Sequence, residues 1–249
     1  MIELFDAQAG FGGGRPGQSW VPSADELLGH MKRLSVGRAL VRTDFEDMDR
    51  NVPLSNQLLY ETCAAHDELV PCPVVLPAGG GDVPSEVEQI DELIAQDSGA
   101  ATVRPGGDSW SLAEWCSGKL FAALAERRVP VLCRKAAFEF EVLADLAKRY
   151  PNLPIVLFQV GYRLQRTLRP LMQTFGNIYL AMGSPYSVHL GVEFMTEVVG
   201  PERLLFGGGF PASDIMPGIT MLTYAEISDA DKQLIGSGNL ERLIGGIRK

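Results

Sequence analysis

The sequence predicts an eight-stranded (β/α)8 barrel of the TIM type, formed by residues 1–249 as a single domain. Eight short apolar runs alternate with seven amphipathic stretches, and a helical tail follows them. No Pro/Ser-rich linker or long run of charge divides the chain. Its 249 residues, 46% of them hydrophobic, suffice for the core of one such barrel.

An open, doubly wound α/β sheet is the alternative fold for the same alternation of elements. That fold needs a phosphate-binding turn directly after the first strand. The glycines of residues 10–15 do not have the Gly-x-Gly-x-x-Gly spacing, and no capped helix begins immediately after them. The barrel is therefore the favoured interpretation.

The predicted strands are apolar runs that mostly lack polar alternation, which is typical of strands buried on both faces. In chain order they are Ile2–Ala7, Arg38–Arg42, Val70–Leu76, Ala101–Arg104, Pro130–Cys133, Pro154–Gln159, Ile178–Ala181 and Arg203–Gly207. Several of the intervening helices begin with a capping box, in which a serine and a glutamate three residues later satisfy each other's backbone N–H groups. The pairs are Ser23/Glu26, Ser85/Glu88 and Ser111/Glu114, and the helical tail runs from Asp229 to Ile247.

Composition excludes several classes of function. A net charge of −9 argues against a general nucleic-acid-binding protein, which usually needs a basic face. No apolar run is long enough to cross a membrane, and the first residues lack the basic start and apolar stretch of a signal peptide, so we expect a cytoplasmic protein. The cysteines form no Cys-x-x-Cys pair, so they predict neither a zinc ribbon nor a redox motif.

Polar side chains follow the predicted strands, at the end of a barrel where functional residues lie. In chain order these are Asp6, Gln8 and Gly10, then Arg42 and Asp44, Arg104, Arg134 and Lys135, Gln159 and Tyr162, and finally Gly208 and Gly209, with Ser213 and Asp214 just beyond. We expect these residues to gather around one mouth.

Four segments resemble the amidohydrolase-related family of metal-dependent (β/α) barrels, the branch that includes decarboxylases and lactonases. The segment VPVLCRK (129–135) resembles a family pattern that ends Val-Pro-Val-x-x-His, and KRYPNLPIVLFQVGY (148–162) resembles Tyr-Pro-x-Leu-x-Ile-Val-Leu-x-His-x-Gly. GPERLLFGGGFP (200–211) resembles Gly-x-x-Arg-Leu-Leu-Phe-Gly-Ser-Asp-Phe-Pro, and IGSGNLERLIG (235–245) resembles the closing Gly-Asn-x-x-Arg-Leu. Their order along the chain makes the resemblance specific.

The sequence departs from the family at every position where the resemblance implies a metal ligand. The first-strand pattern Asp-x-His-x-His reads Asp6-Ala-Gln8-Ala-Gly10, and Arg134, Gln159 and Gly209 stand at the remaining ligand positions. Glutamine and glycine offer no anionic or imidazole donor, and arginine repels a cation. We therefore expect no metal and no other cofactor.

The basic residues at the strand ends suggest a binding site for a small anionic molecule, a carboxylate or a phosphate. Arg42, Arg104, Arg134 and Lys135 would supply charge and donors, with Gln8, Tyr162, Gly208 and Gly209 as further ligand-binding residues. An internal salt-bridge network is the competing interpretation, in which Asp6, Asp44, Asp108 and Asp214 neutralise these cations and Arg134 pairs with Asp6.

Two classes of function stay open at this stage. The first is a barrel that has lost its chemistry and now binds an anionic ligand or a partner. The second is a metal-independent hydrolase or lyase for a small carboxylated substrate, with Asp6, Arg134 and Gln159 as catalytic residues. Segment 11–22, which contains Trp20, is the candidate lid, and Trp110 and Trp115 are predicted packing residues. Homo-oligomerisation is compatible with the sequence, but no feature specifies it.

Overall fold

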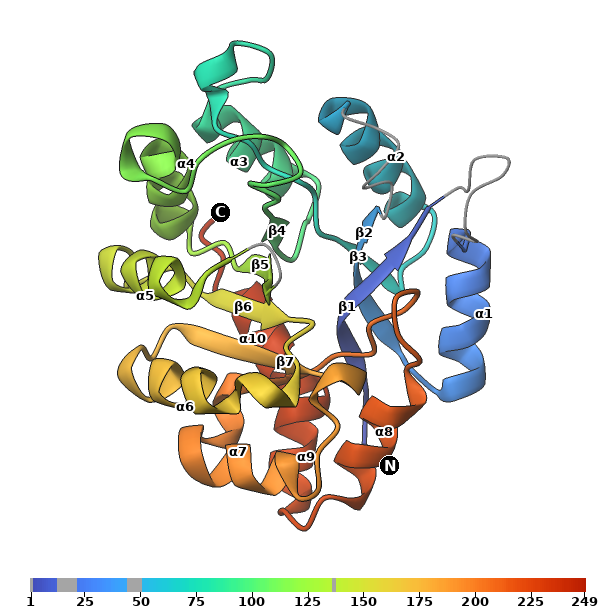
Figure 1. Cartoon of the computed structure of the whole chain (residues 1–249). Coiled ribbons are helices and arrows are strands. Elements are labelled where there is room, and N and C mark those ends of the chain that lie inside the picture. The colour runs from blue at the N-terminus through green and yellow to red at the C-terminus, as the bar shows by residue number, and fades with distance from the viewer. Residues whose placement is uncertain (1, 13–21, 44–50, 136–137) are drawn as a thin grey trace.

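The computed structural model describes residues 2–12, 22–43, 51–135 and 138–249, which form eight parallel strands inside a ring of helices (Figure 1). The strands are β1 (Phe5–Phe11), β2 (Arg38–Thr43), β3 (Leu69–Pro71), β4 (Ala101–Thr102), β5 (Val131–Arg134), β6 (Ile155–Phe158), β7 (Ile178–Met182) and β8 (Leu204–Phe206). The helices are α1 (Ala24–Leu34), α2 (Val52–Ala64), α3 (Glu86–Ala95), α4 (Glu114–Arg127), α5 (Phe140–Arg149), α6 (Gln165–Thr174), α7 (Gly191–Val199), α8 (Met216–Tyr224), α9 (Asp229–Gln233) and α10 (Asn239–Gly245). The predicted (β/α)8 barrel is confirmed.

Two seams join the strand ladders into a barrel. Strands β1 to β3 pair in order, as do β4 to β8, and all these pairs are parallel. A single bridge between Val74 and Thr102 joins β3 to β4. At the β1–β8 seam, Gly10 N–H donates to the Phe210 carbonyl over 2.8 Å and Gly208 N–H donates to Asp6 Oδ1 over 2.7 Å. The Asp6 carboxylate thus accepts a backbone N–H that strand pairing between β1 and β8 would otherwise satisfy.

Three of the predicted strands, β1, β3 and β4, have different bounds in the structure. Strand β1 begins three residues later than predicted and ends at Phe11, so Asp6 lies inside the strand rather than at its end. Strand β3 stops at Pro71 because Pro73 has no N–H to continue a ladder. Strand β4 has only two residues and ends before Val103.

The helix starts follow the predicted capping in two of three cases. Ser23 and Ser85 each form the full reciprocal capping box, with Glu26 and Glu88 respectively. The box predicted at Ser111 does not form, because α4 begins at Glu114 and the Glu114 carboxylate contacts Arg149 and Tyr150 instead. The predicted tail is helical, although residues Leu234–Gly238 form a π-helical turn between α9 and α10.

The core has two parts. Inside the barrel, side chains from the strands pack together and α10 closes the end where the strands begin, with Leu240 and Leu243 against Leu40 and Val70. A larger cluster lies between the strands and the surrounding helices. All four cysteines are free, and only Cys116 is not fully buried. Among the described helices, none combines the length and apolar character needed to cross a bilayer.

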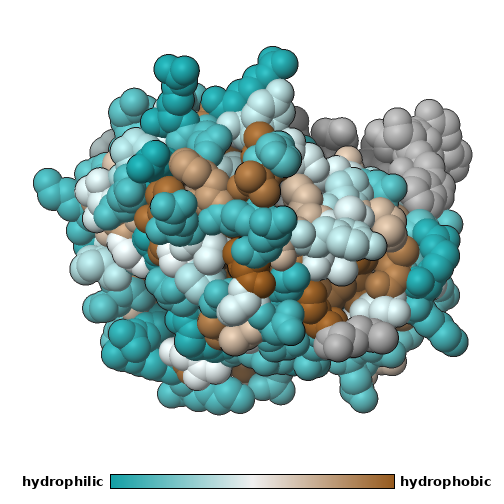
Figure 2. All heavy atoms as spheres, turned by 90° about the horizontal axis from the view of Figure 1, so that it is seen from below, coloured by the Kyte–Doolittle hydropathy of each residue, from teal (hydrophilic) through white to brown (hydrophobic). Residues whose placement is uncertain are grey.

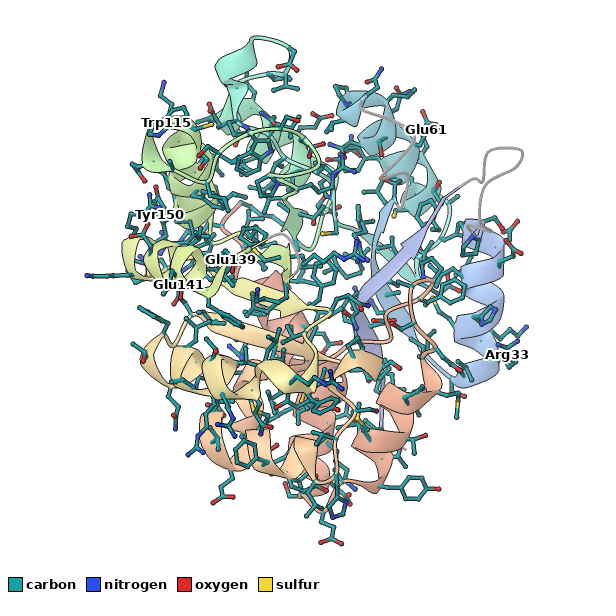
Figure 3. The ribbon with its side chains drawn as sticks, viewed as in Figure 1. Arg33, Glu61, Trp115, Glu139, Glu141 and Tyr150 are labelled. Atoms are coloured by element: carbon teal, nitrogen blue, oxygen red, sulfur yellow. The ribbon has the colours of Figure 1, made fainter. Side chains whose placement is uncertain are left out.

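The face in Figure 2 is mostly hydrophilic, with small scattered groups of hydrophobic side chains. Trp115 is 83% exposed and points away from α4, whereas Trp110 is partly buried against Phe121 (Figure 3). The prediction that both tryptophans pack inside is therefore wrong for Trp115, because the start of α4 turns that position outward.

Replacing Gly208 with alanine should destabilise the barrel. A Cβ at this position would overlap the Asp6 carboxylate that closes the β1–β8 seam, so the hydrogen bond from Gly208 N–H must distort. We expect the free energy of unfolding to fall by about 1–3 kcal/mol, measured by urea denaturation. The matched control is Gly29→Ala on α1, where nothing lies within 4 Å of the added Cβ. It should leave stability unchanged or raise it by up to about 1 kcal/mol, and equal losses in both variants would contradict the assigned role of Asp6.

Candidate ligand-binding site

A bulge in β1 shapes the floor of the candidate site. Asp6 pairs with Ala39 and Ala9 with Val41, so β1 carries one residue more than β2 over this stretch. The backbone N–H of Gln8, within the bulge, donates to Asp6 Oδ1 over 2.9 Å. The same oxygen accepts from Gly208 N–H, so Asp6 satisfies backbone donors from both sides of the seam.

Asp6 is a carboxyl group that can titrate near neutral pH. Burial raises its pKa from 3.8 to about 6, while the hydrogen bonds from Gln8 and Gly208 and the charge of Arg42 act in the opposite direction. The effect of burial on this pKa exceeds the opposing effects of the hydrogen bonds and of Arg42, because the side chain is only 1% exposed. No salt bridge joins Asp6 to Arg134 in the part of the chain that the structure describes, so the predicted pair is wrong.

Gln8 carries a buried amide without a hydrogen-bond partner among the described residues. The residue is fully buried, and neither its Oε1 nor its Nε2 is bonded to any group of those residues. A buried polar group left unpaired costs about 1–3 kcal/mol, and such groups in native proteins call for a functional explanation. Gln8 thus stands out among the residues predicted for the mouth.

Glycines from β7 and β8 make room for the Gln8 amide. A Cβ on Gly183 or on Gly207 would lie 2.6 Å from Gln8 Nε2, so the amide would have to move from its present position. Gly209 has a φ of +80°, where glycine meets no steric penalty. A Cβ there would lie 3.2 Å from Gln8 Nε2 and 3.0 Å from Gln159 Nε2. Gln8, Gln159 and Gly209 are therefore neighbours, as their shared mouth position predicts.

Gln159 is held in an unusual conformation directly after β6. Its φ is +54°, a left-handed conformation uncommon for residues other than glycine, and its Nε2 donates to the Ser213 hydroxyl over 3.4 Å. This conformation brings the amide next to Gly209 and to the segment after β8. Strained backbone is often found at functional sites because the surrounding structure must maintain it.

Arg42 is a basic side chain close enough to Asp6 that its charge lowers the pKa of that carboxyl group. It lies on β2 and is 8% exposed, and its guanidinium stacks on the Phe158 ring at 4.6 Å. Its Nη1 donates to the Ala9 carbonyl at 3.5 Å, beside the bulge. The aromatic ring and the carbonyl hold the orientation of a charged group inside the barrel.

The other predicted cations have different environments. Arg104 donates to both carboxylate oxygens of Asp108, over 3.1 and 3.2 Å, so this part of the predicted salt-bridge network forms. Lys135 donates to the Phe138 carbonyl over 2.6 Å and lies over the Phe140 ring. Arg134 ends β5 with an exposed side chain. Arg104 and Lys135 thus bond residues of their own segments, whereas Arg134 pairs in the strand register with Phe158, on which Arg42 stacks.

The remaining predicted residues are peripheral or lie outside the described segments. Tyr162 is 42% exposed in a short 3-10 helix before α6. Asp214 is exposed, and its carboxylate accepts from Met216 N–H at the start of α8 instead of pairing with an arginine. Asp44, Trp20 and most of the candidate lid fall outside the described residues.

Two residues of the site, Gly183 and Ser213, were not predicted to bind a ligand or to act in catalysis, although Ser213 was expected at the mouth. Gly183 leaves space for the Gln8 amide, and Ser213 accepts from Gln159. Both follow strands in the chain and belong to the mouth by position. Gly183 and Ser213 act on side chains that reach them from other strands, Gln8 and Gln159. No pattern within the segments of Gly183 and Ser213 predicts these contacts.

The side chains at this site do not fit a divalent metal ion. Of the positions where the family resemblance implies ligands, Gln8 and Gln159 offer neutral amides, Gly10 and Gly209 have no side chain, and Arg134 is a cation. Among the described residues, no group of three His, Cys, Asp or Glu side chains is placed to hold one ion. The three histidines lie in α1, after α2 and before α7.

Comparison with known proteins decides the family. A family model described as Amidohydrolase matches residues 22–246, which is most of the chain. The chain belongs to the amidohydrolase family. The resemblance drawn from the four sequence segments is thereby confirmed. No curated protein sequence matches the chain.

Solved structures similar to this amidohydrolase-family barrel include several decarboxylases. The 5-carboxyvanillate decarboxylase LigW from Sphingomonas paucimobilis has a TM-score of 0.76 at 14% identity, over 98% of this chain and 99% of that one. A 2,6-dihydroxybenzoate decarboxylase from Rhizobium gives 0.73 at 15% identity, over 98% and 99%. The 5-carboxyvanillate decarboxylase from Novosphingobium aromaticivorans, complexed with manganese and a nitrobenzoic acid, gives 0.77 at 11% identity, over 98% and 96%. At these identities the similarity establishes the fold.

The raised pKa of Asp6 predicts a specific dependence of stability on pH. Because the folded-state pKa of about 6 exceeds the ordinary 3.8, the stability that the protonated group contributes is complete below pH 4 and lost as the pH rises to 6. A rise of about two pKa units corresponds to about 3 kcal/mol. Urea denaturation of the wild type and of Asp6→Asn should therefore give a difference in unfolding free energy that changes between pH 4 and 6. A constant difference over that interval would contradict the raised pKa.

Proposed function

We propose that this member of the amidohydrolase family binds a small carboxylate or phosphate at the barrel mouth without a metal ion. The observation that carries the proposal is the buried Gln8 amide, whose two polar atoms have no partner among the described residues. It lies beside Gln159 and Gly209, where the resemblance implies metal ligands. A carboxylate or phosphate oxygen that accepts from Nε2 would satisfy the donor of this amide and offset part of the cost of burying it.

Two arginines next to Phe158, Arg42 and Arg134, favour an anionic ligand at this end of the barrel. Arg42 lies inside the barrel, oriented by Phe158, and Arg134 lies exposed at the end of β5 beside Phe158 in the strand register. A guanidinium presents a planar set of N–H donors that matches a carboxylate or a phosphate. Arg104 and Lys135, which the sequence analysis included, have partners on their own segments and contribute less to this proposal.

Replacing Gln8 with methionine should separate ligand binding from stability. Methionine fills a similar volume without an unpaired amide, so the free energy of unfolding should rise by about 1–3 kcal/mol. Titration calorimetry with 2,6-dihydroxybenzoate, benzoate, acetate and phosphate should show binding of at least one anion to the wild type. The Gln8→Met and Arg134→Ala variants should each weaken that binding at least tenfold.

The matched control for these variants is Arg33→Ala on α1. Figure 3 shows Arg33 pointing outward from the ring of helices, and its guanidinium contacts His30. This variant removes one positive charge from the outer side of α1 and should bind the anion as the wild type does. Unchanged affinity in Gln8→Met, or equal weakening in the control, would refute binding at this site.

A metal-independent lyase is the second candidate function, and the pKa of Asp6 specifically favours it. A carboxyl group with a pKa of about 6 can both give and take a proton near neutral pH. In a decarboxylation the bond to the carboxylate carbon breaks, carbon dioxide leaves, and the remaining carbanion takes the proton from Asp6. Asp6 then regains a proton from water.

Carbon dioxide release from 2,6-dihydroxybenzoate and 5-carboxyvanillate tests the lyase. With a chelator present, the wild type should release carbon dioxide, and Asp6→Asn should reduce the rate at least a hundredfold because the general acid is lost. Arg33→Ala should leave the rate unchanged. Activity that appears only after manganese is added would contradict a metal-independent reaction, and activity that persists in Asp6→Asn would refute the role of Asp6.

A further inference from the structure

A hollow of 380 Å³ lies at the end of the barrel opposite the mouth. Its walls come from the segments that precede β5, β6 and β7 and from α10 and the tail after it. The lining residues are Arg128, Pro151, Asn152, Pro154, Gly176, Asn177, Tyr179, Arg242, Leu243 and Gly246. The lining contains two arginines and no acidic residue, in a protein with a net charge of −9.

A third arginine lies close to this hollow. The backbone N–H of Arg248 donates to the Arg127 carbonyl over 2.8 Å, which holds the chain terminus beside Arg128. The nearby cations Arg127 and Lys249 are paired with Asp91 and Asp97. Arg128, Arg242 and Arg248 form no salt bridge within the described part of the chain.

The contacts of these arginines leave donors for a ligand. Arg242 uses Nη2 to bond the Glu202 carbonyl over 2.7 Å and Asn239 Oδ1 over 3.2 Å, which holds its side chain against α10. Arg248 bonds the Glu126 carbonyl through Nη1 alone. A guanidinium has five N–H donors, so both side chains retain several.

Arg128 occupies a position where the backbone favours glycine. It is the C-cap of α4, with φ 55° and ψ 34°, a left-handed conformation that helices usually assign to glycine. Its backbone N–H bonds the Ala125 and Leu124 carbonyls, while its exposed side chain makes no bond within the described chain. An arginine at this position therefore carries a conformational penalty that no contact of its side chain offsets.

The remaining walls suit the organic part of a ligand. Tyr179, Leu243, Pro151 and Pro154 offer apolar surface, and the side chains of Tyr179 and Asn152 have no hydrogen-bond partner among the described residues. Two arginines in the lining, with Arg248 on the neighbouring segment, favour a doubly charged anion over a single carboxylate. We propose that this hollow binds a phosphorylated small organic molecule, with Arg128 and Arg242 contacting the phosphate and Tyr179 and Leu243 contacting the organic group.

Calorimetric titration with inorganic phosphate and with phenyl phosphate, at constant ionic strength, tests this site. Both probes should bind the wild type, phenyl phosphate more tightly because its ring can pack on Tyr179 and Leu243. Arg128→Gly should weaken both at least tenfold, and so should Arg242→Ala. Arg128→Gly suits the left-handed backbone, so its unfolding temperature should stay the same or rise, and lost binding cannot then be attributed to unfolding.

Arg166→Ala on α6 is the matched control, because it removes an exposed arginine outside the hollow. It should bind both probes as the wild type does. Wild-type affinity in Arg128→Gly, equal weakening in Arg166→Ala, or no binding of either probe would overturn the proposal. Arginine-dependent binding of duplex DNA without binding of phenyl phosphate would overturn it in favour of a macromolecular partner.

Discussion

The barrel depends on one carboxylate that joins its first and last strands. Asp6 Oδ1 accepts from Gly208 N–H of the segment after β8 and from Gln8 N–H of the β1 bulge. These bonds are made inside the protein, where an unpaired N–H is expensive and a charge is poorly solvated. The carboxylate is therefore needed for closure, and burial simultaneously raises its pKa toward neutrality. Closure of the fold and the proton transfer proposed for the mouth thus depend on the same side chain.

The site around Asp6 is built from amides and glycines. Gln8 enters space that Gly183, Gly207 and Gly209 leave open, and Gln159 reaches the same space through a left-handed backbone. Neither amide carries charge, so Asp6 and Arg42 provide the charge beside them. This combination suits recognition of a ligand by hydrogen bonds and one ion pair, and it differs from the ligand set that a divalent metal requires.

The sequence predicted the architecture well because strand and helix periodicity depends on local burial. It also identified Gln8, Gln159 and Gly209 as neighbours, since the family resemblance aligned them with positions that share one site. It failed where the outcome depended on contacts between distant segments. Asp6 pairs with backbone N–H groups rather than Arg134, and Glu114 meets Arg149 of α5 rather than capping its own helix. The extra residue in β1 likewise arises from pairing with β2, which no single segment encodes.

Gly209 restricts which residues position 209 can hold. Any side chain at 209 must adopt a left-handed backbone and place its Cβ 3.0 Å from the Gln159 amide and 3.2 Å from the Gln8 amide. An aspartate introduced at 209 would have both the strained backbone and the close contacts with the two amides. A side chain at this position would therefore need a strained backbone and small shifts of both glutamine amides, so glycine at 209 keeps the space between them open.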